Sequence, residues 1–147
     1  MRMKTESFLQ MFAYLSRIAK EACGQQLQRY GVHAGQHYLL ELLWETPEGL
    51  TVGEIAERLA VEAPSITRTV RRMSRQGLVE KHPHPTDARL VIVKLTTKGK
   101  ALEPVIPQVI SHVEEQMLAG LSEVERAFLM RLLKHMLQNL EDIPSAP

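Results

Sequence analysis

The sequence predicts a mainly α-helical protein with one small β-hairpin, built from about six helices. Apolar residues recur at helical spacing along most of the 147 residues, as they do in helices that bury one face. Only residues 78–95 depart from this spacing: two short runs with strand character flank a stretch rich in turn-forming residues.

The first two helices are predicted from this spacing and from the residues that end them. Residues 6–30 form a long apolar stripe that no proline interrupts, and Gly31 can end it. A second helix is expected over residues 35–46, because Pro47 and Gly49 follow directly.

Two shorter helices follow. Thr51 and Glu54 have the spacing of a capping box, in which the threonine caps the backbone and the glutamate reaches back. After a brief break, Pro64 suits the first turn of the next helix, where its missing N–H costs nothing. Gly77 is a good C-terminal cap, so this second short helix is expected over residues 64–76.

The hairpin and two further helices complete the chain. Strands are expected over 78–81 and 90–95, since the second run is rich in β-branched residues. A helix then runs from about residue 97 to about residue 118, and the prolines at 104 and 107 should kink its first half. Ser122 and Glu125 form another capping box, which opens the last helix.

Two short helices joined by a tight turn and followed by a hairpin form a winged helix-turn-helix, whose second helix enters the DNA major groove. We therefore expect one protomer over residues 1–147, with a winged helix-turn-helix DNA-binding lobe over 50–96. Residues 1–46 and 97–142 are expected to form a helical dimerisation region. The terminal helices carry broad apolar stripes, which can pack against a two-fold mate or cover their own protomer.

Charge is concentrated in the predicted lobe. The whole chain has a net charge of +1, but residues 62–100 carry nine basic and three acidic residues, a net +6. A basic patch on an otherwise acidic body can dock on phosphate. The nine basic residues are Arg68, Arg71, Arg72, Arg75, Lys81, Arg89, Lys94, Lys98 and Lys100.

The second short helix has a basic face. At about 100° per residue, Arg68, Arg71 and Arg75 lie opposite the apolar side, flanked by Ser65 and Thr67. Arginine can pair with guanine through two hydrogen bonds, and hydroxyls can meet bases or phosphates. The alternative is a solvated helix surface. No acidic residue four positions away pairs with these arginines, which favours DNA contact.

Asp87 and Arg89 lie at the tip of the predicted hairpin. Alternate residues of an extended segment point to one side, so Asp87 can brace Arg89. A braced arginine suits a narrow minor groove, where the negative potential is enhanced; the alternative is an ordinary exposed ion pair, which contributes little. The residues predicted to contact DNA are Ser65, Thr67, Arg68, Arg71, Arg72, Arg75, Thr86, Asp87 and Arg89.

Residues 50–102 resemble the DNA-binding lobe of the MarR family of bacterial regulators. The matching segments are the EIAERL helix, the SITRTVRRM recognition helix, the GLVEK strand, the P-x-D-x-R wing and the LT-x-KG start of the next helix. The flanking helices fit as well. The resemblance implies a homodimer that binds a pseudo-palindromic operator, usually as a repressor released by a small ligand or an oxidant. It makes Ser65, Thr67 and Arg68 major-groove readers and Arg89 the minor-groove arginine.

Three kinds of signal are compatible with this resemblance. A small aromatic or anionic effector is expected between the dimer helices and the lobe, lined by Leu15, His37 and Met73, although Leu15 and Met73 also fit an ordinary core. Cys23 suggests redox sensing, yet a lone helical cysteine is more often a packed apolar group. His33 and His37, with His112 or Glu41, suggest metal sensing without a compact metal-binding motif. In the wing, His82 and His84 are expected to approach phosphate or solvent.

Other functional classes fit less well. The sequence has no Gly-rich phosphate loop, no G-x-S-x-G elbow and no dense carboxylate pair, so we expect neither an enzyme nor a cofactor or metal requirement. A winged helix that binds only protein is a further alternative, which the arginine face disfavours. No apolar run long enough for a membrane span and no secretory signal are found. We expect a cytoplasmic protein with double-stranded DNA and a second copy as partners.

Overall fold

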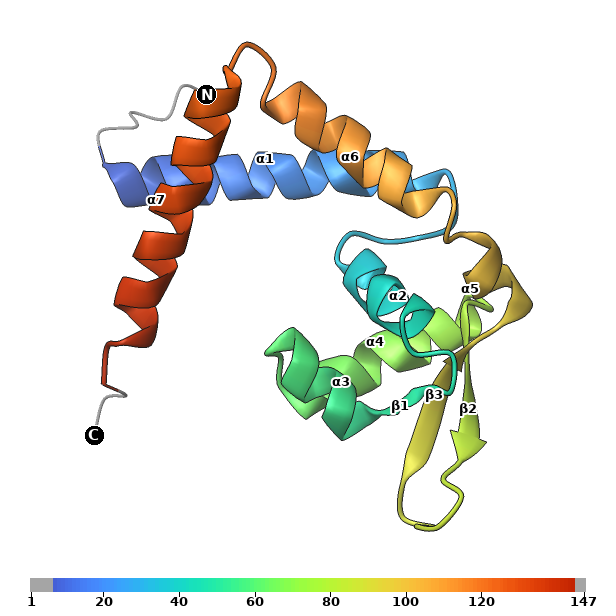
Figure 1. Cartoon of the computed structure of the whole chain (residues 1–147). Coiled ribbons are helices and arrows are strands. Elements are labelled where there is room, and N and C mark those ends of the chain that lie inside the picture. The colour runs from blue at the N-terminus through green and yellow to red at the C-terminus, as the bar shows by residue number, and fades with distance from the viewer. Residues whose placement is uncertain (1–6, 145–147) are drawn as a thin grey trace. The chain divides into compact units, whose positions relative to one another are not determined.

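The computed structural model describes residues 7–144, which form a mainly helical protein with a small antiparallel sheet (Figure 1). Within these residues the chain divides into two compact units, which meet at Val113 and Glu114 in the sequence. The helices of the described residues are α1 (Phe8–Gln28), α2 (Gln36–Trp44), α3 (Val52–Leu59), α4 (Ala63–Arg75), α5 (Thr97–Ala101), α6 (Ile106–Met117) and α7 (Glu123–Glu141). The winged helix-turn-helix predicted from the sequence is confirmed.

The structure has seven helices within residues 7–144, where the sequence predicted about six. The helix expected from about residue 97 to about residue 118 is broken into α5 and α6, with turns between them, and not merely kinked. Pro104 cannot donate a backbone hydrogen bond and disfavours helical geometry at the residue before it. Pro107 is tolerated because it lies in the first turn of α6.

The sheet has three strands, so the expectation of a hairpin alone was incomplete. Its order is β1 (Leu50–Thr51), β3 (Val91–Leu95), β2 (Val79–Pro83), and both pairings are antiparallel. In β1 only two residues pair with β3, too few for an alternating pattern to be visible in the sequence. In Figure 1 the β2–β3 hairpin projects beyond the helices α2, α3 and α4.

One hydrophobic core connects the helices and sheet of the first unit. Residues of α2, α3, α4 and β3 share this core, and Leu27 of α1 and Ile106 of α6 extend it. Its most buried members from the central elements include Leu39, Leu40, Leu43, Ile55, Val70, Met73 and Val93. The core is therefore continuous across residues 46–50, where the sequence suggested a division between regions. That division remains a prediction.

The start of α5 is packed directly against the start of the hairpin. Thr96 caps α5 by accepting a hydrogen bond from the Gly99 N–H at 3.1 Å, and its hydroxyl donates to the Gly77 carbonyl at 2.6 Å. The Trp44 indole N–H donates to the Gly99 carbonyl at 3.0 Å. A Cβ on Gly99 would overlap the carbonyl oxygen of Leu78. Only glycine fits here without a backbone shift.

We predict that Gly99→Ala lowers the free energy of unfolding by about 2 kcal/mol, because the added methyl forces the two backbones apart. The matched control is Gly53→Ala in α3, where a Cβ meets only the Thr51 hydroxyl oxygen at 4.0 Å. This control should leave stability unchanged or raise it by about 0.5 kcal/mol. Urea denaturation at one fixed protein concentration measures both; equal stability of the two variants would contradict the packing described.

Candidate nucleic-acid interface

Helix α4 turns an apolar side into the core and a basic side to solvent. Its buried residues are Ile66, Val70 and Met73. Its exposed arginines are Arg68, Arg71, Arg72 and Arg75. Within residues 7–144, none of these four guanidinium groups is paired with a carboxylate. The basic face predicted from the sequence is therefore present and free to meet a polyanion.

The first turns of α4 order part of this face. Pro64 lies in the first turn, as predicted. The Ser65 hydroxyl accepts a hydrogen bond from an Arg68 Nη2 at 3.1 Å, and the Thr67 hydroxyl donates to the Ala63 carbonyl at 3.1 Å. Each hydroxyl is thus held close to the helix, beside the arginines. That these residues contact DNA remains a prediction.

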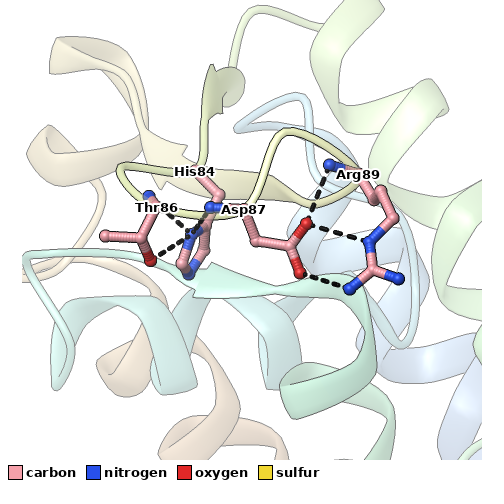
Figure 2. Close-up of polar contacts among 4 residues, drawn as sticks. All are labelled: His84, Thr86, Asp87 and Arg89. Atoms are coloured by element: carbon pink, nitrogen blue, oxygen red, sulfur yellow. Dashed lines mark hydrogen bonds and ion pairs between the residues drawn. The ribbon is translucent and has the colours of Figure 1, made fainter.

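The predicted brace between Asp87 and Arg89 is confirmed (Figure 2). One carboxylate oxygen of Asp87 accepts from Arg89 Nε and the other from Nη2, both at 3.1 Å. The Arg89 side chain is 88% exposed, whereas that of Asp87 is 29% exposed. The wing therefore presents a guanidinium group to solvent in a fixed orientation.

The geometry behind the brace differs from the prediction. The segment is not extended: the Leu90 N–H donates to the Asp87 carbonyl at 3.1 Å, which closes a turn. The Arg89 backbone N–H also donates to the Asp87 carboxylate at 3.0 Å. An aspartate that accepts from the N–H two residues ahead forms an Asx turn, so the contact follows from turn chemistry and not from strand alternation.

These contacts stabilise the charged form of the aspartate. The side-chain hydrogen bonds from Arg89, and then its backbone N–H, hold the pKa of Asp87 below its ordinary value. The same side-chain bonds raise the pKa of Arg89. Because the Asp87 pKa is lowered, the brace is complete at neutral pH and is lost only when the pH falls through that lowered pKa.

The wing histidines are engaged within the hairpin. The His82 ring contacts the Glu80 carboxylate at 2.9 Å. The Nδ1 atom of His84 accepts backbone N–H bonds from Thr86 at 3.2 Å and Asp87 at 3.0 Å (Figure 2). The expectation that both rings simply approach phosphate or solvent missed these contacts. A histidine that closes a loop in this way has no sequence pattern of its own.

Comparisons with known proteins agree with this geometry. The sequence model of the MarR family matches residues 30–90. The HTH-type transcriptional regulator BilQ of Clostridium symbiosum is 27% identical over 129 residues, which are 85% of this chain and 89% of BilQ. A putative transcriptional regulatory protein for the hcr operon of Thauera aromatica is 28% identical, covering 78% of this chain and 69% of that protein.

A solved structure extends the likeness to the full fold. The S. aureus MepR–DNA complex superimposes with a TM-score of 0.83 at 25% sequence identity, covering 90% of this chain and 98% of MepR. The chain is similar to the MarR family over residues 30–90. The family's sequence model ends at residue 90, just beyond the braced arginine of the wing.

The C-terminal end of α4 is held by side chains whose contacts could not be predicted from the sequence. The Gln76 side chain donates to the Gly31 carbonyl at 2.8 Å and accepts from Gln36 at 2.9 Å. The Gln76 carbonyl accepts from the Lys98 ammonium at 2.9 Å. Only structure reveals these partners, because they are distant in the sequence.

A cavity of about 510 Å³ lies beside α4, between α2, α3 and α4. Its lining residues include the basic Arg58 and Arg72 and the apolar Leu39, Leu59 and Ile66. Within residues 7–144, neither arginine has an ion-pair partner. Such a lining suits a small anion with an apolar body.

None of the three residues predicted to line an effector crevice lines the cavity beside α4. Leu15 is exposed on α1, whereas His37 and Met73 are buried. His37 Nδ1 is enclosed without a hydrogen-bond partner in the described part of the chain, and burial lowers the pKa of His37. The crevice itself remains a prediction.

The structure does not add support for metal sensing or redox sensing. No group of three His, Cys, Asp or Glu side chains suited to a metal ion occurs between residues 7 and 144. Burial raises the pKa of the Cys23 thiol, which disfavours the reactive thiolate at neutral pH. None of the helices described is both long and apolar enough to cross a membrane.

Proposed function

We propose that this chain is a transcriptional regulator that binds operator DNA as a homodimer and represses until a small anionic effector releases it. The observation that carries the proposal is the basic surface of the lobe. Four arginines of α4 and the braced Arg89 are exposed, and no carboxylate outside the wing pairs with them in the described structure. The MepR structure with which the chain superimposes was solved with DNA.

The two basic elements suit different grooves. Helix α4 has the width and the polar face for the major groove, where Arg68 can pair with guanine through two hydrogen bonds. The wing tip is narrow, and its exposed guanidinium group suits the enhanced negative potential of a narrow minor groove. The remaining arginines of α4 can neutralise phosphates, which makes binding steeply salt-dependent.

The homodimer is supported by apolar surface that the single chain leaves uncovered. Helix α7 buries none of its residues in the chain alone. Its exposed apolar residues include Val124, Phe128, Leu132, Leu137 and Leu140, and those of α1 include Phe8, Leu9, Phe12 and Leu15. Patches of this extent mark association surfaces. A two-fold dimer can place two recognition helices about 34 Å apart, one turn of DNA.

The effector proposal rests on the cavity lined by Arg58 and Arg72. Arg72 belongs to the recognition helix, so an anion bound there contacts the same element that faces DNA. An effector releases DNA only if it binds the DNA-free geometry more tightly. A carboxylate that neutralises Arg72 also removes positive charge from the DNA-facing helix. Both effects weaken operator binding.

Removing either key arginine should weaken operator binding. We predict that Arg68→Ala and Arg89→Ala each reduce affinity by about tenfold, since one good arginine contact contributes about 1–3 kcal/mol. The measurement is fluorescence anisotropy on a duplex selected from a randomised pool with the wild-type protein. Arg29→Ala, an exposed arginine at the end of α1, is the matched control. If both variants bind like the control, the proposed interface is wrong. If the wild-type protein selects no duplex from the pool, the alternative of a winged helix that binds only protein is favoured.

A charge on the exposed stripe of α7 should dissociate the dimer. We predict that Phe128→Asp is monomeric by light scattering after gel filtration, because two carboxylates would face an apolar interface. Phe128 is 53% exposed in the chain alone, so helical content should persist by circular dichroism. Glu57→Lys, at an exposed position of α3 outside this apolar surface, should stay dimeric. A dimeric Phe128→Asp variant would contradict the assignment of this surface.

The cavity predicts the chemistry of release. With benzoate as the probe, we expect millimolar concentrations to displace the wild-type protein from its selected duplex. Arg58→Ala should still bind the duplex but need several-fold more benzoate, since one guanidinium group is lost. Titrations with benzamide, which lacks the charge, control for apolar binding alone. Equal benzoate sensitivity of wild type and Arg58→Ala would exclude this cavity as the effector site.

A further inference from the structure

The wing loop that carries Arg89 spans residues 84–90. His84 stabilises it through both its backbone and its ring. At the base of the loop, the His84 backbone N–H donates to the Leu90 carbonyl at 3.3 Å. Within the loop, the His84 ring accepts hydrogen bonds from the backbone N–H groups of Thr86 and Asp87 (Figure 2). One residue therefore fixes both the closure and the internal fold of the loop.

The ring acts through a single atom. Nδ1 accepts the backbone N–H of Thr86 at 3.2 Å and that of Asp87 at 3.0 Å, and the Thr86 hydroxyl lies 3.5 Å away. In the described structure no other acceptor serves these two N–H groups. Both bonds require the lone pair on Nδ1, which a proton on that atom would remove.

These bonds are coupled to the position of the arginine. The ring holds the backbone N–H of Asp87, the Asp87 carboxylate holds the guanidinium group of Arg89, and a turn from Asp87 to Leu90 ends the loop. Pro83 and Pro85 flank the histidine and restrict the backbone on either side. The least restricted part of the loop, residues 86–89, is thus the part that the ring orders.

We propose that His84 is a positioning residue for DNA binding: its Nδ1 lone pair orders the wing loop so that Asp87 and Arg89 are presented in the binding geometry. This inference rests on the proposed function. His84 acts through Asp87 and Arg89 and needs no contact of its own with DNA.

Three variants distinguish the effect of the hydrogen-bond acceptor at position 84 from the effect of the imidazole ring. His84→Asn places Oδ1 the same number of bonds from the backbone as Nδ1, and asparagine accepts such N–H bonds in Asx turns. His84→Leu is of similar size without an acceptor. His82→Leu is the matched control, because it removes a neighbouring wing histidine that contacts Glu80 and not the loop.

We expect His84→Leu to weaken operator binding by roughly 3- to 10-fold, the effect of losing one to two hydrogen bonds. His84→Asn and His82→Leu should stay within about twofold of the wild type. The proposal is overturned if His84→Leu binds like the wild type, or if His84→Asn loses as much affinity as His84→Leu, since an acceptor at that position would then not matter.

A second measurement needs no DNA and so separates this inference from the proposed function. In ¹⁵N NMR of the free protein, His84 should show the neutral form protonated at Nε2. The heteronuclear NOE of the Arg89 backbone amide should fall in His84→Leu and persist in His84→Asn. An Arg89 amide equally ordered in all three proteins contradicts the positioning role, whether or not a duplex is bound. A wild-type protein that binds no duplex while showing these NMR effects contradicts only the proposed function.

Discussion

The burial of one side of α4 is the constraint on which the rest depends. Ile66, Val70 and Met73 are almost fully enclosed, and removing such side chains from water provides most of the free energy that fixes the helix rotation. Once that side faces the core, the spacing of the arginines along the helix places them toward solvent. The basic surface is a consequence of hydrophobic packing, so it needs no carboxylate partners to hold it in place.

The recognition helix is also fixed along its axis. Gln76 joins its C-terminal end to Gly31 in the loop before α2 and to Gln36 at the start of α2. The Lys98 ammonium donates to the Gln76 carbonyl at that same end. Cations near a helix C-terminus are favourable because they complement the helix dipole. Helix and wing meet through the short connection at Gly77 and Leu78, against which α5 is packed. A rigid connection of this kind keeps the α4 arginines and the wing arginine at one spacing, as two grooves of a duplex require.

Much of this arrangement follows from local sequence signals. Both capping boxes, the proline in the first turn of α4 and the brace between Asp87 and Arg89 depend on residues within four positions of each other, and all are present. The features that were missed depend on distant or very short segments. Strand β1 has two residues, and the Gln36–Gln76 contact spans 40 positions. The break before α6 requires knowing that Pro104 ends a helix instead of bending it. Interactions between residues close in the sequence can be predicted from one sequence, whereas contacts between distant segments cannot.

The central claim is that two copies of one basic surface grip a single duplex, and hydroxyl-radical footprinting on a selected duplex tests it most directly. We expect two symmetric sets of protected sugars whose centres lie about 10 base pairs apart. The outer minor-groove protections should disappear in Arg89→Ala, while the central ones persist. A single unsymmetric block of protection, or outer protections unchanged in Arg89→Ala, would contradict it.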